Sequence, residues 1–160
     1  MKLANPASMG MAEQWEAHLN EPIMTDPGTK PRILLADDHA AILDKVAALL
    51  APEFDVVAAV GDGLLALEAA ARFCPELVVL DIAMPGLDGI HAARELRRNG
   101  CDAKIVFLTV QEDEDYVSAA LDAGALGYVL KSRMQSDLIL AIRQALAGEV
   151  FISPRPQAAE

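Results

Sequence analysis

The prediction of the fold depends most on the stretch VVLDIAMPGLDGI, residues 78–90. Residues 78–80 form an apolar run typical of a buried strand, and the run ends in a carboxylate, Asp81. A carboxylate is costly to bury unless another group pairs with it. The Pro-Gly pair that follows ends any regular element and begins a turn. An acid in this position therefore points to a functional site at the end of a buried strand.

The bulk composition fits one globular domain. The chain has 160 residues, is 53% hydrophobic and has a mean hydropathy of +0.26. Charges interrupt every apolar run before it reaches membrane-spanning length, and the N-terminus lacks the features of a signal peptide. We therefore expect a cytoplasmic protein without a membrane partner. The two cysteines, Cys74 and Cys101, are too few for a disulfide framework and are interpreted as buried or incidental thiols.

The charge balance argues against a nucleic-acid surface within these residues. The formal net charge is −11, from 13 basic and 24 acidic side chains. Phosphate contact needs clustered positive charge, and the densest basic group is Arg94, Arg97 and Arg98. We interpret this group as the solvated face of a helix.

Both ends of the chain differ from its middle. Residues 1–30 are rich in proline and glycine, and we interpret them as a flexible N-terminal extension or tag. A short docking helix over residues 11–19 is the alternative, and Met24 would be a natural start for the domain. Residues 31–152 form the expected domain, and residues 153–160 the expected C-terminal tail or linker stub.

From residue 31 onward, apolar strand-like runs alternate with segments of helical periodicity. The expected strands cover residues 32–36, 55–60, 76–81, 104–109 and 126–131. The expected helices cover residues 41–50, 64–73, 89–98, 112–124 and 137–148. Ser136 is the expected N-cap of the last helix. Uniformly apolar strands separated by helices predict an α/β fold with a parallel sheet covered on both faces.

Polar side chains gather where these strands end. The first strand leads into Asp37 and Asp38, the third ends in Asp81, the fourth in Thr109 and the fifth in Lys131. In parallel sheets, sites form at the carboxyl ends of the strands. We therefore expect three acids, a hydroxyl and an amine to converge on one edge.

The charges of these groups suggest phosphoryl transfer. Three close carboxylates repel one another unless a cation joins them, and oxygen ligands of high negative charge favour Mg²⁺. We expect Asp38, with Asp37 near it, to hold the metal, and the backbone carbonyl of Ala83 to be a further ligand. Asp81 would be the nucleophile that forms an acyl phosphate, with Lys131 as a second positive charge.

Four segments carry a resemblance to a known family. They are ILLADDHAAIL at residues 33–43, VVLDIAMPGLDGI at 78–90, IVFLTV at 105–110 and GALGYVLK at 124–131. In this order they resemble the motifs of response-regulator receiver domains of bacterial two-component systems, over about residues 32–152. The resemblance implies a flavodoxin-like (βα)5 doubly wound sandwich, with five parallel strands in the order 2-1-3-4-5.

The resemblance also implies a function. A sensor histidine kinase would donate its phosphoryl group to Asp81, and Thr109 would then move to hydrogen-bond that group. Tyr128 would turn inward to fill the space that Thr109 leaves. The changed surface would span the fourth helix, fifth strand and fifth helix, and a downstream protein or a second copy in a homodimer would read it. Such a domain is a phosphoacceptor with intrinsic phosphotransfer and autodephosphorylation chemistry, and not an enzyme.

Finer features of the sequence look like the NarL/LuxR-type subgroup, whose members usually carry a DNA-binding helix-turn-helix domain afterwards. These features are ADDH, GYVLKS and the ending AGEVFISP. Ser132 follows the motif lysine, where many receivers have a cis-proline. Because the sequence ends at Glu160, we expect no DNA-binding domain within these residues. The alternative to a stand-alone switch is therefore the receiver half of a DNA-binding regulator.

The motif set also disfavours two competing functions. An aspartyl-phosphate phosphatase usually needs a second acid two residues past its nucleophile, where this chain has Ala83. A degenerate receiver is disfavoured because every position of the motif set is filled. His39 is interpreted as a helix-start residue and not as a metal ligand. In the family, the positions of Ala83 and Gln111 influence the loss of the acyl phosphate to water, and only Gln111 offers a side chain that could orient that water.

Overall fold

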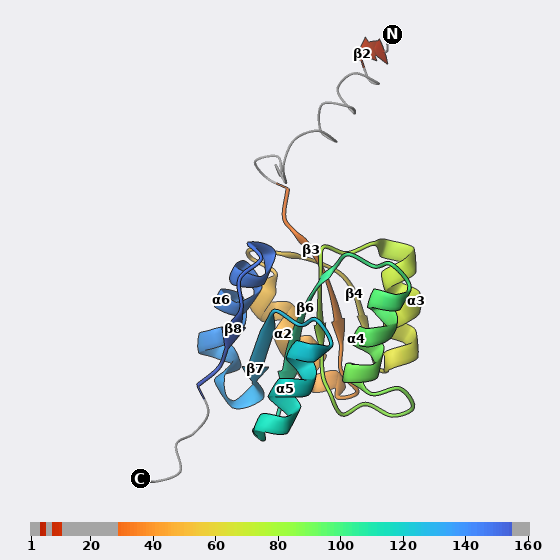
Figure 1. The fold of residues 1–160 in the computed structure, drawn as a ribbon. Coiled ribbons are helices and arrows are strands. Elements are labelled where there is room, and N and C mark those ends of the chain that lie inside the picture. Colours follow the sequence, from red (N-terminus) through yellow and green to blue (C-terminus); the bar gives the residue numbers. More distant parts are fainter. Residues whose placement is uncertain (1–3, 6–7, 11–28, 155–160) are drawn as a thin grey trace. The chain divides into compact units, whose positions relative to one another are not determined.

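The computed structural model describes residues 4–5, 8–10 and 29–154, which belong to two compact units, residues 1–30 and 31–160. In the first unit, β1 (Ala4–Asn5) and β2 (Ser8–Gly10) pair antiparallel. The docking helix considered for residues 11–19 lies outside the described residues. The second unit carries the expected α/β domain (Figure 1).

The sheet of the second unit is parallel throughout. Its strands are β3 (Arg32–Ala36), β4 (Asp55–Val60), β5 (Leu77–Leu80), β6 (Lys104–Thr109), β7 (Gly127–Leu130) and β8 (Phe151–Ile152). Their order in the sheet is β4-β3-β5-β6-β7-β8, which confirms the predicted order 2-1-3-4-5 for the first five. The short β8 was not predicted, because two residues are too few to show a strand period.

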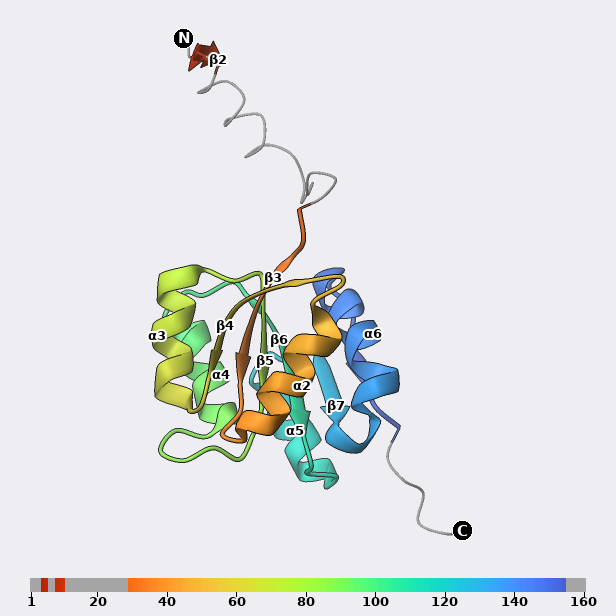
Figure 2. The same cartoon turned by 180° about the vertical axis from the view of Figure 1, so that it is seen from behind.

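Helices cover both faces of the sheet (Figures 1 and 2). They are α2 (Ala40–Leu50), α3 (Gly63–Phe73), α4 (Gly89–Arg98), α5 (Glu114–Asp122) and α6 (Met134–Leu146). Helices α2 and α6 share one buried cluster with the sheet, and α3, α4 and α5 share the other. The crossovers therefore place helices on both sides, as a doubly wound fold requires.

Alternation along the central strands divides the core between the two faces. Leu34, Val78 and Phe107 pack toward α3, α4 and α5, whereas Leu35 and Val79 pack toward α2 and α6. All of these side chains are buried. Because both faces of the sheet are covered, its polar residues gather at the strand ends, where the backbone ladder stops.

The start of α6 differs from the prediction. A 3₁₀ turn, η1 (Lys131–Arg133), follows β7 and leads directly into the helix, which therefore begins three residues before the predicted start. Ser136 consequently lies inside α6 and is not its N-cap. Its hydroxyl donates to the carbonyl of Arg133 and to Oδ1 of Asp137 instead. The N-caps of α3, α4 and α5 are the aspartates Asp62, Asp88 and Asp113.

The structure adds detail to two surface interpretations. Arg97 is exposed, but its guanidinium donates to the carbonyls of Ala103 and Gly124, and so ties the end of α4 to the end of α5. Cys74 is exposed and Cys101 half-buried, and both are free thiols, which agrees with their interpretation as buried or incidental thiols. Among the described residues, no helix is both long and apolar enough to cross a membrane.

Candidate functional site

The polar residues singled out in the sequence lie at the ends of four adjacent strands. Asp37 follows β3, Asp81 follows β5, Thr109 is the last residue of β6 and Lys131 follows β7. Backbone bonds continue the ladder one step past the strands, because the amide of Asp81 donates to the carbonyl of Ala36 at 2.9 Å. The sheet therefore brings these residues to the same end of four adjacent strands, where Lys131 contacts Asp37 and Asp81 directly.

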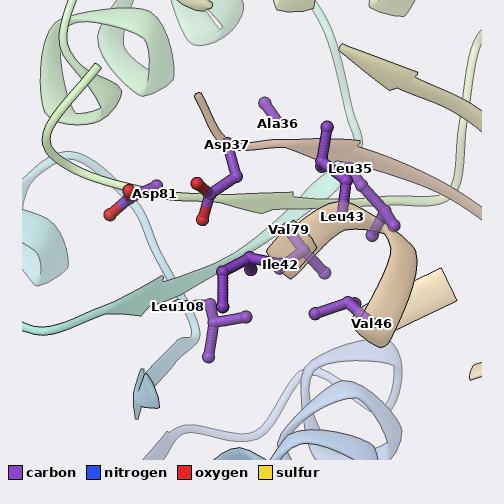
Figure 3. Close-up of a pocket in the computed structure, with 9 residues that line it drawn as sticks. All are labelled: Leu35, Ala36, Asp37, Ile42, Leu43, Val46, Val79, Asp81 and Leu108. Carbon is purple, nitrogen blue, oxygen red and sulfur yellow. The ribbon is translucent and has the colours of Figure 1, made fainter. Parts of the chain in front are cut away.

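Lys131 joins two buried acids. Its Nζ lies 2.7 Å from Oδ2 of Asp37 and 3.1 Å from Oδ2 of Asp81. Asp37 is 4% exposed and Asp81 3% exposed, so water screens these charges weakly. The two acids follow neighbouring strands, and Figure 3 shows them at the same end of the pocket. One ammonium balances only one of the two carboxylates, so the cluster keeps an excess of negative charge.

Burial and charge pairing set the protonation of this cluster. Burial raises the pKa of Asp81, Lys131 acts in the opposite direction, and Asp37 adds to the increase. Burial alone would lower the pKa of Lys131, but its close contacts with the carboxylates of Asp37 and Asp81 raise it overall. The lysine therefore stays charged at neutral pH, and the environment of Asp81 favours any added positive charge.

The acids fit a hard divalent cation. Ligand atoms of Asp37, Asp38, His39 and Asp81 all lie within 4.8 Å of one another. Oδ2 of Asp37 is buried and lacks a hydrogen-bond partner among the described residues, because its contact with Lys131 is an ion pair without hydrogen-bond geometry. A buried carboxylate oxygen without a hydrogen bond is expected where a metal binds.

His39 lies closer to this site than its sequence position suggested. As predicted, it stands at the start of α2, as the N-cap before Ala40, and its amide donates to Oδ1 of Asp37 at 2.9 Å. Its Nδ1 also lies 3.1 Å from Oδ1 of Asp38 and 3.2 Å from Oδ1 of Asp37. The imidazole thus faces both acids. The run of two acids and a histidine directly after a strand is the signal that could have indicated this contact.

Thr109 and Tyr128 are linked through Gln111. Oγ1 of Thr109, which is fully buried, accepts from the amide of Gln111 at 3.2 Å. The hydroxyl of Tyr128 donates to the carbonyl of Gln111 at 2.7 Å. The tyrosine ring is buried, and burial, with nearby Tyr116, Asp113 and Asp81, raises its pKa to about 12. The ring of Tyr128 is therefore packed in the core and held by Gln111, and its role as a switch residue stays a prediction.

The loop after Asp81 depends on a glycine that sequence reasoning did not single out. The amide of Gly89 donates to the carbonyl of Ile82 at 2.8 Å, and a Cβ at residue 89 would overlap the backbone carbonyl of Asp81. Any larger residue there would displace Asp81. Ala83 is exposed in this loop, two residues past Asp81, and the role of its carbonyl as a metal ligand stays a prediction.

A small cavity lies beneath the acids, between α2 and the sheet (Figure 3). Its walls are apolar except at the end formed by Asp37 and Asp81. Its volume of about 10 Å³ is at the lower limit for one water molecule. The cavity is far too small for a substrate, so a reaction partner must approach Asp81 from the open edge of the sheet.

Comparisons with known proteins agree with this geometry. Residues 33–143 match the family described as response regulator receiver domain. The chain is 37% identical over 128 residues to the transcriptional regulatory protein DegU of Brevibacillus brevis, covering 79% of this chain and 54% of that protein. It is 38% identical over 123 residues to the nitrate/nitrite response regulator protein NarL of Escherichia coli strain K12, covering 76% of this chain and 57% of NarL.

Solved structures share the same architecture. A two-component response regulator of the LuxR family from Aurantimonas sp. SI85-9A1 superposes with a TM-score of 0.75 at 34% identity, covering 79% of this chain and 91% of that chain. The signal receiver domain of the NarL regulator from Mycobacterium tuberculosis gives a TM-score of 0.72 at 28% identity, covering 76% and 99%. The chain spans little more than half the length of the curated relatives it matches.

Proposed function

The chain belongs to the response regulator receiver domain family, and from this membership we propose that it is a phosphorylation-dependent signalling switch. Asp81 accepts a phosphoryl group from the phosphohistidine of a sensor histidine kinase. The observation that carries this proposal is the contact of Lys131 with both buried acids, Asp37 and Asp81, at the open edge of the sheet. Each of these residues alone would be weak evidence for phosphoryl transfer, whereas the three together fit this one reaction.

The transfer follows from the charges at the site. A carboxylate oxygen of Asp81 attacks phosphorus, a P–O bond forms, and the P–N bond to the kinase histidine breaks. The histidine nitrogen keeps the electron pair of that bond and takes up a proton from solvent. Lys131, whose Nζ lies 3.1 Å from Asp81, holds positive charge beside the phosphoryl oxygens.

Mg²⁺ is the cation that suits the remaining ligands. Asp37, Asp38 and Asp81 would hold it, together with the carbonyl of Ala83. When bound, Mg²⁺ neutralises charge that develops on the transferring phosphoryl group. The excess of carboxylates over ammonium groups at this edge supports a divalent cation there.

The output follows from the added charge. A phosphoryl group on a side chain adds about −1.5 to −2 charge at neutral pH, and local groups must match it. Thr109 and Tyr128 respond to this charge, and the surface of α5, β7 and α6 changes. A downstream protein or a second copy of the chain reads this surface, where Tyr116 of α5 and Leu140 of α6 are exposed. The proposal includes no contact between this domain and nucleic acid or a membrane. We assign the protein to the cytoplasm.

A second candidate concerns the whole protein. DegU is a transcriptional regulatory protein, and this chain covers 54% of its length. This observation favours a receiver that forms the front half of a longer, DNA-binding regulator. We place the end of the receiver domain at Ser153, one residue beyond the boundary expected from the sequence, because Ser153 is buried and hydrogen-bonded. The residues after it would form the linker.

Intact mass spectrometry tests the proposed acceptor. The wild-type chain is incubated with Mg²⁺ and acetyl phosphate, beside Asp81→Asn and the control Asp55→Asn. Asp55 is an exposed acid at the start of β4, and it therefore lies at the amino ends of the parallel strands, whereas Asp81 lies at their carboxyl ends. We expect one added phosphoryl group in the wild type and in Asp55→Asn, and none in Asp81→Asn. A phosphorylated Asp81→Asn variant, or an unmodified wild type, would contradict the proposal.

A further inference from the structure

A third buried acid, Asp137, lies outside the acidic site. It is in the first turn of α6, is 5% exposed and takes no part in the proposed transfer. Hydrogen bonds from Ser153, Arg133 and Ser136 reach its carboxylate at 2.7, 2.8 and 2.9 Å. Burial opposes its ionisation, but these donors outweigh burial and lower the pKa of Asp137. The carboxylate is therefore charged at neutral pH and fully bonded, which is a rigid arrangement.

The position of Asp137 matters because of the turn that precedes α6. Lys131 is the first residue of η1, and its side chain reaches Asp37 and Asp81 only if the backbone of this turn is fixed. Ser132 stands where many receivers have a cis-proline, and the described residues contain no cis peptide bond. A 3₁₀ turn of three residues is a weak element by itself. Something else must hold it.

Asp137 and Ser153 hold this turn from both sides. On the far side, Nε of Arg133, the last residue of η1, donates to Oδ2 of Asp137. On the near side, the amide of Leu130 donates to Oγ of Ser153 at 3.3 Å, and Oγ donates in turn to the same Oδ2. One carboxylate oxygen thus links the residue before Lys131 to the last residue of its turn.

The short strand β8 places Ser153 in this network. The amide of Phe151 donates to the carbonyl of Leu126, and the amide of Ser153 donates to the carbonyl of Tyr128, both at 2.8 Å. Ser153 is therefore fixed beside β7 by backbone bonds and is 2% exposed. Strand β8 is therefore the third element, besides η1 and α6, that takes part in this hydrogen-bond network.

We propose that Asp137, together with Ser153, is a positioning residue for Lys131 in phosphoryl transfer. This inference rests on the proposed function, because it concerns the same reaction. Asp137 touches neither Asp81 nor the phosphoryl group and acts only through the backbone of the lysine turn. Its loss lets Lys131 move relative to Asp81, and a displacement of about 1 Å of a catalytic group can cost on the order of 100-fold in rate.

The test compares two acids that each pair with an arginine of α6 or its entry turn. Asp137→Asn removes the charge that holds Arg133, and the control Glu53→Gln removes the charge that holds Arg143 near the other end of the helix. Phosphorylation rates with acetyl phosphate are measured at saturating Mg²⁺, and Mg²⁺ affinity is measured separately. We expect Asp137→Asn to react at least about 10-fold more slowly, with unchanged Mg²⁺ affinity, and Glu53→Gln to react at the wild-type rate.

A double-mutant cycle separates positioning from general stability. In a Lys131→Ala background, Asp137→Asn should change the rate by no more than about twofold, because its effect passes through Lys131. The same loss of rate with and without Lys131 would overturn the proposal, as would equal rates for Asp137→Asn and Glu53→Gln. Ser153→Ala, which removes a single hydroxyl, gives the same comparison if Asp137→Asn does not fold.

A measurement that needs no phosphotransfer keeps this inference distinct from the proposed function. The side chain of Lys131 is only 11% exposed, so it should react slowly with an amine-modifying reagent. We expect faster labelling of Lys131 in Asp137→Asn and in Ser153→Ala, and unchanged labelling in Glu53→Gln, as read by peptide mass. Unchanged labelling in all three variants would overturn the positioning role. A wild type that takes no phosphoryl group would instead overturn the proposed function.

Discussion

Two sets of charged side chains in this domain have similar distances and opposite surroundings. Arg143 and Glu53 form two hydrogen bonds of 2.6 Å each, and their side chains are 58% and 37% exposed. Lys131 contacts Asp37 and Asp81 at 2.7 and 3.1 Å, and none of these three side chains is more than 11% exposed. The exposed pair has the shorter contacts, yet water and salt screen it. Contact distance therefore does not rank these interactions.

Charge balance separates the two sets further. The exposed pair is one cation with one anion, and its ideal geometry satisfies both groups. The buried set has one ammonium for two carboxylates, with Asp38 nearby, and leaves one buried oxygen without a hydrogen bond. Burial of charge is costly unless pairing is complete. This excess of negative charge supports the proposal that the buried set takes up a further cation.

The largest expected effect comes from removing the shared cation of the buried set. Lys131→Met leaves the buried carboxylates of Asp37 and Asp81 without their shared cation, and we expect a loss of about 3 kcal/mol in the free energy of unfolding at neutral pH without Mg²⁺. Urea denaturation measures this loss. It should shrink at acid pH, because burial raises the pKa of Asp81 and its carboxyl group therefore becomes neutral at a higher pH than usual.

Arg143→Met is the matched control for this comparison. It removes the cation of the exposed pair from the same domain, and Glu53 is then left in contact with water. We expect a much smaller loss of stability than in Lys131→Met. Equal losses in the two variants would contradict the view that burial and charge balance decide the strength of these sets.

A smaller loss of stability is expected from a substitution that displaces Asp81 without changing the charge of the buried set. Gly89→Ala places a Cβ against the carbonyl of Asp81, and overpacking of this kind costs about 1–3 kcal/mol. The control is Gly61→Ala, because a Cβ at Gly61 would meet nothing within 4 Å. We expect Gly89→Ala to lower both the urea midpoint and the phosphorylation rate, and Gly61→Ala to keep both near wild type. A Gly89→Ala variant that matches Gly61→Ala would show that Asp81 tolerates displacement.

The sequence predicted the main strands and the polar residues at their ends, but it did not predict the contacts that hold the turn after β7. Uniform apolar runs revealed the five longer strands, and the strand order then followed from the family resemblance. The acids, Thr109 and Lys131 follow or end four of these strands, so their convergence could be predicted from topology alone. Strand β8 escaped prediction because it has two residues and depends on pairing with β7.

What could not be predicted depends on contacts between distant residues. Asp137 and Ser153 are 16 residues apart, and only the pairing of β8 brings them together. The misplaced N-cap at Ser136 has a similar origin, because the η1 turn extends the helix backward to Met134. The inward ring of Tyr128 also depends on tertiary packing, since the sequence does not show where the carbonyl of Gln111 lies. Local pattern does not report such contacts.

The smallest expected effect belongs to the exposed pair and concerns its dependence on pH and salt. The hydrogen bonds and charge of Arg143 lower the pKa of Glu53, although burial acts slightly the other way. A carboxyl group whose pKa is lowered in the folded state adds stability above its unfolded pKa, and this stability is lost as pH falls through the folded value. We expect Glu53→Gln to be slightly less stable than wild type at neutral pH, and equally stable in acid.

Salt provides the independent check on this last prediction. Because both side chains of the pair are exposed, added salt should reduce the difference in urea midpoint between wild type and Glu53→Gln. The same salt should change the difference between wild type and Lys131→Met far less, since the buried set is shielded from ions. If salt does not change the difference in urea midpoint between wild type and Glu53→Gln, the exposed pair behaves like a buried one. That result would contradict the contrast between the exposed pair and the buried set.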